Sequence, residues 1–151
     1  MGESRLWGDS SKVRDQLKNV TRIKASCFAF GAILANGSVV TWGDPEYAGD
    51  SCEVRAQLRN VQDIQSSRHA FAAILADGSV VSWGDPDYGG DSRDVQDQLK
   101  DVQWIQSSYA AFAAVLADGS VVTWGDRNYG GDSGEVHHVL RKERPWEVKH
   151  H

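Results

Sequence analysis

The chain has 151 residues, 40% of them hydrophobic and 25% charged, with a formal net charge of −5. This composition is typical of a globular protein, and the acidic balance argues against a nucleic-acid surface, which needs clustered Lys and Arg. No run approaches the roughly 18 apolar residues of a membrane span, and the N-terminus lacks the apolar stretch of a secretory signal. We therefore expect a soluble cytoplasmic protein, with an organellar form left open.

A 41-residue repeat organises the sequence. The triplet Trp-Gly-Asp recurs at that fixed step, beginning at Trp42, Trp83 and Trp124. Residues 42–82 and 83–123 are identical at 28 of 41 positions. A period of this length indicates a solenoid, a propeller or another repeat array.

The repeat divides the chain into units. We predict one repeat domain over residues 1–140, followed by a C-terminal tail or cap at 141–151. The predicted units are a partial one at about 1–16 and three full ones at 17–57, 58–98 and 99–140. The tail ends in His150 and His151, which could belong to a purification tag, so no chemistry is assigned to them.

Each full unit contains three predicted strands. In the second unit they span 61–66, 71–76 and 79–83, and the first of them recurs at 20–25 and 102–107. The middle strand is apolar on both faces, which predicts a strand sandwiched between layers. Asp or Asn precedes each hairpin glycine and predicts a two-residue type I′ turn; these glycines are Gly37, Gly78 and Gly119.

A Gly-rich loop and a short helix complete the unit. Residues 92–100 read as one or two helical turns, with Ser92 predicted to cap them by accepting backbone N–H bonds. Val95 and Leu99 are four residues apart and should face the same side. The unit is therefore predicted to be all-β, with one short helix.

One unit carries a recurring set of residues, in order Val61, Ile64, Ser67, Leu75, Asp77-Gly78, Val80-Val81, Trp83-Gly84 and Tyr88-Gly89. This pattern resembles the repeat of the regulator of chromosome condensation family, and its length is closer to the compact blades of β-lactamase inhibitor protein II. The resemblance implies β-propeller-type blades. The family's Gly-Gln-Leu-Gly stands here as Gly89-Gly90-Asp91-Ser92, which puts a fourth strand in doubt. Family activities depend on loop residues not matched here, so the resemblance implies a fold and no activity.

The number of blades leaves the assembly open. A closed propeller needs at least about four blades, and this chain has three full units with partial ends. Two copies could close a ring as a homodimer, another protein could complete the arc, or the units could stack as an open β-solenoid. An uncovered blade face at each end would be unfavourable in water.

Candidate binding residues come from positions that vary between the repeats. The pair before the middle strand differs in every unit and should lie on turns at one rim, where binding residues concentrate. We predict partner contacts at these turns and at the non-repeated Trp104; the turn residues are Phe28, Arg68, His69 and Tyr109. The repeated Trp42, Trp83 and Trp124, and the hairpin glycines, are interpreted as packing and turn residues.

Acidic loop residues offer an alternative function. Asp85, Asp87 and Asp91 surround glycines in a pattern that could hold Ca²⁺, although capping of turns explains them more simply. Cys27 and Cys52 are interpreted as incidental thiols. No catalytic set or cofactor motif emerges, so we predict no enzyme activity and no cofactor. The predicted function is a protein-interaction scaffold or accessory subunit, and the alternative is a Ca²⁺-stabilised or ligand-binding module.

Overall fold

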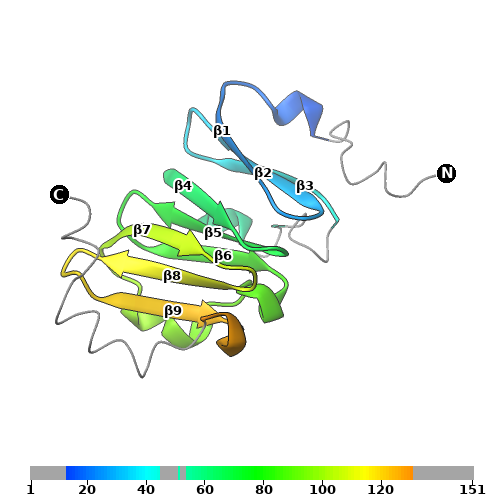
Figure 1. Cartoon of the computed structure of the whole chain (residues 1–151). Helices are drawn as coiled ribbons and strands as arrows, with labels where there is room; N and C mark the ends of the chain where they lie inside the picture. Colours follow the sequence, from blue (N-terminus) through cyan, green and yellow to red (C-terminus); the bar gives the residue numbers. More distant parts are fainter. Residues whose placement is uncertain (1–12, 45–50, 52–53, 131–151) are drawn as a thin grey trace, which may run out of the picture.

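The computed structural model describes residues 13–44, 51 and 54–130. Most of the predicted partial first unit, the tail at 141–151 and Cys52 lie outside the described residues. Three antiparallel sheets follow one another along the chain, each built from three strands (Figure 1). The tandem three-stranded sheets predicted from the 41-residue repeat are confirmed.

Each sheet is one repeat, and we call the three sheets blades 1, 2 and 3. Within every blade the strands pair antiparallel in chain order. Blade 1 consists of β1 (Val20–Ala25), β2 (Ala29–Leu34) and β3 (Val39–Gly43). Blade 2 consists of β4 (Val61–Ser66), β5 (Ala70–Leu75) and β6 (Val80–Gly84). Blade 3 consists of β7 (Val102–Ser107), β8 (Ala111–Leu116) and β9 (Val121–Gly125).

The hairpin turns differ from the prediction. The Gly78 N–H donates to the Leu75 carbonyl at 2.9 Å, and the Leu75 N–H donates to the Ser79 carbonyl at 2.9 Å. Gly78 has φ +85°, whereas Asp77 is not among the residues with positive φ. The predicted two-residue type I′ turn is therefore wrong, and the connection is a three-residue loop closed by a left-handed glycine. Asp77 is suited to it because its Oδ1 accepts from the Ser79 N–H and hydroxyl, at 3.0 and 2.6 Å.

The predicted helical segments are short 3₁₀ helices that precede the first strand of each blade: η1 (Arg14–Gln16), η3 (Arg55–Gln57) and η5 (Arg93–Gln98). Two further 3₁₀ turns lie in the loop after the third strand, η4 (Pro86–Tyr88) and η6 (Arg127–Tyr129). The predicted Ser92 cap is wrong, because its side chain caps no backbone N–H. Asp91 accepts from the Arg93 N–H instead, at 3.0 Å. The Ser92 hydroxyl bonds to Gln96 Oε1 and to the Ser82 hydroxyl, both at 3.0 Å.

The hydrophobic core lies between blades. Strand β5 alternates, so Phe71 and Ala73 pack toward blade 1 while Ala70, Ala72 and Ile74 pack toward blade 3. The core between blades 1 and 2 also holds Ile33, Leu58, Val61, Ile64 and Trp83. The core between blades 2 and 3 holds Leu99, Val102, Ile105 and Trp124 at the equivalent positions and Phe112 as the counterpart of Phe71, with Val95 packed against it as predicted. A middle strand that is apolar on both faces is therefore explained by a neighbour on each side.

Backbone bonds join each blade to the next at the hairpin end. The Val61 N–H donates to the Gly37 carbonyl and the Val102 N–H to the Gly78 carbonyl, both at 2.9 Å. A Cβ on Gly78 would lie 2.9 Å from the Asp101 Cα, so a side chain there would separate blades 2 and 3. The glycines predicted to serve hairpin turns therefore also allow close contact between blades.

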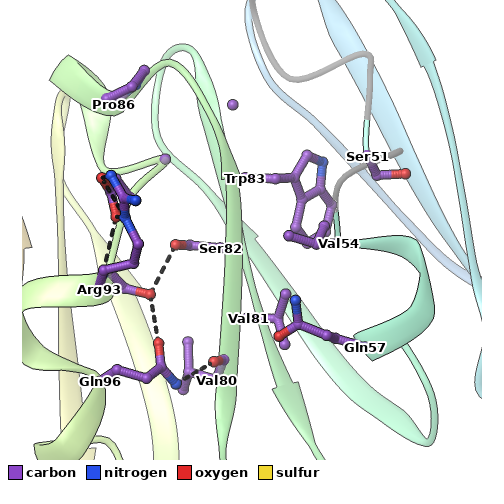
Figure 2. A pocket seen from close by; sticks show the side chains of 14 residues that line it. Ser51, Val54, Gln57, Val80, Val81, Ser82, Trp83, Pro86, Arg93 and Gln96 are labelled. Carbon is purple, nitrogen blue, oxygen red and sulfur yellow. Dashed lines mark hydrogen bonds and ion pairs between the residues drawn. The ribbon is translucent and has the colours of Figure 1, made fainter.

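The outer edge of blade 2 faces a hollow of about 570 Å³ between η3 and η5 (Figure 2). The residues labelled along β6 in Figure 2 include Val80, Ser82 and Trp83. Gln96 Nε2 donates to the Val80 carbonyl at 3.0 Å and so satisfies part of this strand edge. A polar side chain on an edge is a common protection against unwanted pairing. Blade 2 has three strands and a 3₁₀ helix here, in agreement with the doubt about a fourth strand.

Candidate functional site

The three variable turns lie side by side on one rim. They connect the first and second strands of each blade, and their backbones are bonded in series. The Cys27 N–H donates to the Arg68 carbonyl at 2.8 Å, and the Arg68 N–H donates to the Tyr109 carbonyl at 2.9 Å. Equivalent positions in successive blades are thus joined directly, and the side chains that follow them are held in one line.

Five aromatic side chains form a continuous row along this rim, which we call the aromatic row: Phe28, His69, Tyr88, Tyr109 and Tyr129. The Phe28 and His69 rings are stacked, with centroids 5.7 Å apart and planes 9° apart. The His69 and Tyr88 centroids are 4.4 Å apart in an edge-on contact. Tyr109 continues the row at 5.8 Å from Tyr88 and 5.1 Å from Tyr129. The predicted residues Phe28, His69 and Tyr109 are therefore brought together.

Two members of the row, Tyr88 and Tyr129, were not predicted as site residues. Each belongs to a 3₁₀ turn whose first carboxylate caps it, and Asp85 Oδ1 accepts the Asp87 N–H at 2.9 Å. The turn is tied to the rim because the Ser67 hydroxyl donates to the Tyr88 carbonyl at 2.6 Å. Ser108 and Tyr129 repeat this bond at 2.6 Å. The signal was present in the repeated Tyr-Gly of the loop, which recurs with the 41-residue period.

The row is accessible on one side. Phe28, Tyr109 and Tyr129 are 38%, 44% and 47% exposed. A groove of about 560 Å³ runs between the tyrosines of blades 2 and 3, and the carboxylates of Asp87 and Asp126 line it. The Arg68 guanidinium lies 5.1 Å from the centroid of the Tyr109 ring, a cation–π distance. The rim therefore presents flat aromatic faces, one guanidinium and several carboxylates.

His69 lies inside the row and is buried. Burial lowers the pKa of its imidazole, and the neighbouring Arg68 guanidinium lowers the pKa further. The carboxylates of Asp85 and Asp44 oppose this shift. The ring is consequently neutral at pH 7 and stacks on Phe28 as an uncharged aromatic group.

A pH-dependent loss of stability is expected from this environment. Because the folded-state pKa of His69 is lower than that of the unfolded chain, the unfolded chain binds the proton more readily. The stabilisation is present above the unfolded pKa of about 6.5 and is lost as the pH falls below it. Urea unfolding between pH 7.5 and about 5.5 should show a decline that His69→Gln abolishes. Identical pH profiles for the two proteins would contradict this account.

Trp104 is not part of the aromatic row. It lies in β7, opposite Val115 in the strand register, and is 41% exposed. Its equivalents are Arg22 in β1 and Asp63 in β4, which form an ion pair between blades 1 and 2 at 2.6 Å. Trp104 therefore occupies the position in blade 3 at which the other two blades contact each other.

The repeated tryptophans and loop carboxylates have structural contacts. Trp83 and Trp124 are buried, and Trp124 Nε1 donates to the Gly89 carbonyl of the preceding blade at 3.0 Å. Asp91 pairs with Arg93 at 2.8 Å, which lowers the pKa of its carboxyl. Within residues 13–44, 51 and 54–130, no three His, Cys, Asp or Glu side chains group closely enough to hold a metal ion. Asp85 and Asp91 thus act as capping and pairing groups.

No described helix is long and apolar enough to cross a membrane.

Three tandem three-stranded sheets with cores between them define an all-β repeat protein of β-propeller type. No protein-family model and no curated protein matches the chain. Among solved structures, it is similar to yeast RCC1 (Prp20) bound to Kap60, with 20% identity, a TM-score of 0.52, and coverage of 72% of this chain and 30% of that one.

Two further propeller-like structures match to a similar degree. Human WBSCR16 has 18% identity and a TM-score of 0.52, covering 82% of this chain and 36% of that one. The CRINKLY WD40 ectodomain of the Arabidopsis thaliana receptor kinase ACR4 has 18% identity and a TM-score of 0.51, covering 70% and 38%. The chain thus spans about a third of the length of these proteins. The similarity supports the RCC1-like repeat fold implied by the sequence.

Proposed function

We propose that this protein is a non-catalytic interaction module that binds a polypeptide along the aromatic row. The observation that carries the proposal is the continuity of the row, since its members come from three blades and three of them, Phe28, Tyr109 and Tyr129, are exposed. Large, rigid aromatic side chains supply much of the binding energy at protein interfaces. Yeast RCC1, a protein of similar fold, has been solved with Kap60 bound, which supports a protein partner for this chain.

The row offers recognition chemistry but no reaction chemistry. Its histidine lies between the stacked Phe28 ring and the edge-on Tyr88 ring rather than beside a nucleophile. The nearby carboxylates cap 3₁₀ turns, as Asp85 and Asp126 do. Polypeptide binding uses the exposed ring faces and the groove without requiring a proton-transfer group.

A peptide library displayed on phage and selected against the full chain tests this proposal. We expect selected peptides to lose at least about tenfold in affinity with Tyr109→Ser, because this change removes an exposed ring that contacts both Tyr88 and Tyr129. Tyr109→Phe keeps the ring and should retain binding. Lys100→Ala, at the opposite end of blade 3, is the surface control. Failure to enrich any peptide, or equal affinities for all four proteins, would overturn the proposal.

A further inference from the structure

Blade 1 exposes an apolar face that the other blades bury. Ile23 is 54% exposed, whereas its equivalents Ile64 and Ile105 are each 1% exposed. Val20 is 37% exposed, compared with 5% for Val61. In blades 2 and 3 this face is covered by the preceding blade, through the two cores already described. An apolar face with this exposure in one blade alone marks a surface suited to another blade.

Blade 3 presents the opposite half of the same interface. Its residues Ala113, Val115 and Thr123 are partly exposed, while their blade 2 equivalents Ala72, Ile74 and Ser82 are buried against blade 3. The corresponding residues of blade 1 are Gly31, Ile33 and Thr41, so all three blades carry small and β-branched side chains here. The outer faces of blades 1 and 3 are therefore complementary in the way that adjoining blades within the chain already are.

We propose that blade 3 of one copy packs against blade 1 of a second copy, and that two copies close a six-bladed ring. A head-to-tail interface that closes after one repetition gives a two-fold symmetric dimer. The described residues form three blades, and propellers typically have about four to eight, so two copies of these three blades fall in this range and three copies do not. This inference is independent of the peptide-binding proposal, because it concerns the blade faces and not the aromatic row.

The backbone bonds between blades continue across this contact. On the rim, the series from Cys27 to Arg68 to Tyr109 repeats once per blade, and the next acceptor for the Tyr109 N–H is the carbonyl of Cys27 of the second copy. At the hairpin end, Gly37 and Gly78 accept from the first strand of the following blade. Gly119 would accept from Val20 of the second copy in the same way. These two backbone bonds, one at the rim and one at the hairpin end, thus each have a donor and an acceptor at the new contact.

Side chains that differ between the repeats would also contact each other across the two copies. Arg22 pairs with Asp63 between blades 1 and 2, and the next equivalent position is Trp104. In the dimer, Trp104 would face Arg22 of the second copy, and a guanidinium against an indole is a favourable cation–π pair. Likewise Tyr129, 47% exposed, would meet Phe28 of the second copy, so the aromatic row would run around the whole ring.

Light scattering on the full 151-residue chain tests the dimer. We expect a mass twice the 16.6 kDa of the chain. Ile23→Arg, which places a charge in the proposed contact, should give the single-chain mass, while Gln62→Arg on blade 2 adds the same charge at an exposed site and should remain dimeric. Circular dichroism melting verifies that both variants fold. A wild-type monomer at every concentration, or an open polymer, would overturn the proposal.

A second pair of variants tests the register of the contact independently of Ile23. Trp104→Asp recreates across the two copies the ion pair that Arg22 and Asp63 form within one copy, so the dimer should persist. Trp104→Arg instead places like charges opposite each other at this contact, while Arg22 keeps its partner Asp63 within the copy, and should raise the dissociation constant of the dimer at least about tenfold. A dimer that dissociates with Trp104→Asp, or that is unchanged with Trp104→Arg, would contradict the proposed register and overturn the inference.

Discussion

Replacing Ile64 with alanine is expected to lower the free energy of unfolding by about 2 to 5 kcal/mol. The side chain is 1% exposed and belongs to the core between blades 1 and 2. Its Cδ1 lies 3.8 Å from the position that a Cβ on Gly31 of the facing blade would take. Truncation therefore removes buried methyl groups and leaves a cavity at the blade interface, where rigid strands on both sides limit collapse.

Urea unfolding followed by far-ultraviolet circular dichroism measures this loss. Gln62→Ala, an exposed position two residues away on the same strand, is the matched control and should change the free energy of unfolding by less than about 0.5 kcal/mol. Because each blade contacts only its neighbours, Ile64→Ala should destabilise only the interface between blades 1 and 2. It should therefore also weaken the cooperativity of unfolding between these two blades. Equal losses for the two variants would show that these blades do not pack at Ile64.

The strands could be predicted from the sequence because each is specified three times. A weak pattern such as residues 61–66 would not identify a strand alone, yet its recurrence at 20–25 and 102–107 gave bounds that the structure reproduces. The middle strands were also identifiable, since their apolar residues occupy both faces. Repetition averages out the surface substitutions that obscure a single strand.

The connections were less predictable because one dipeptide suits several backbone conformations. Asp77-Gly78 is compatible with a type I′ turn and also with the three-residue loop observed, in which only the glycine has positive φ. Which of the two conformations forms depends on the hydrogen bonds that Ser79 donates to Asp77, and residue spacing in the sequence does not predict these bonds. Serine is similarly a residue type that often caps helices, but the Ser92 hydroxyl is hydrogen-bonded to Ser82 and Gln96 instead.

The candidate site was predicted in part. Phe28, Arg68, His69 and Tyr109 were selected because their positions vary, and the serial bonds between the turns bring them together. Tyr88 and Tyr129 were missed for the opposite reason, since a repeated residue was interpreted as part of the scaffold. Trp104 was selected correctly as an exposed residue, but it lies on a strand away from the rim. Residues that vary between the repeats and residues that recur in them therefore lie next to each other on one surface.

Replacing Gly89 with alanine is expected to cost about 2 to 5 kcal/mol, and Gly130→Ala only about 1 to 2 kcal/mol. Both glycines follow a 3₁₀ turn and have φ +97°, so the strain of a left-handed alanine is the same in each. A Cβ on Gly89 would lie 2.6 Å from Cδ2 of the buried Phe112 ring, whereas a Cβ on Gly130 would meet nothing within 4 Å.

The difference between these two variants isolates the packing of one blade's loop on the next blade's core. Gly89 also accepts the bond from Trp124 Nε1, so displacement of the loop would weaken that contact as well. Urea midpoints of both variants provide the measurement, and near-equal losses would show that the loop relaxes without disturbing Phe112. The residues directly after Gly89 line the hollow beside β6. A larger loss for Gly89→Ala would therefore show that this loop stabilises the packing of blade 2 on blade 3.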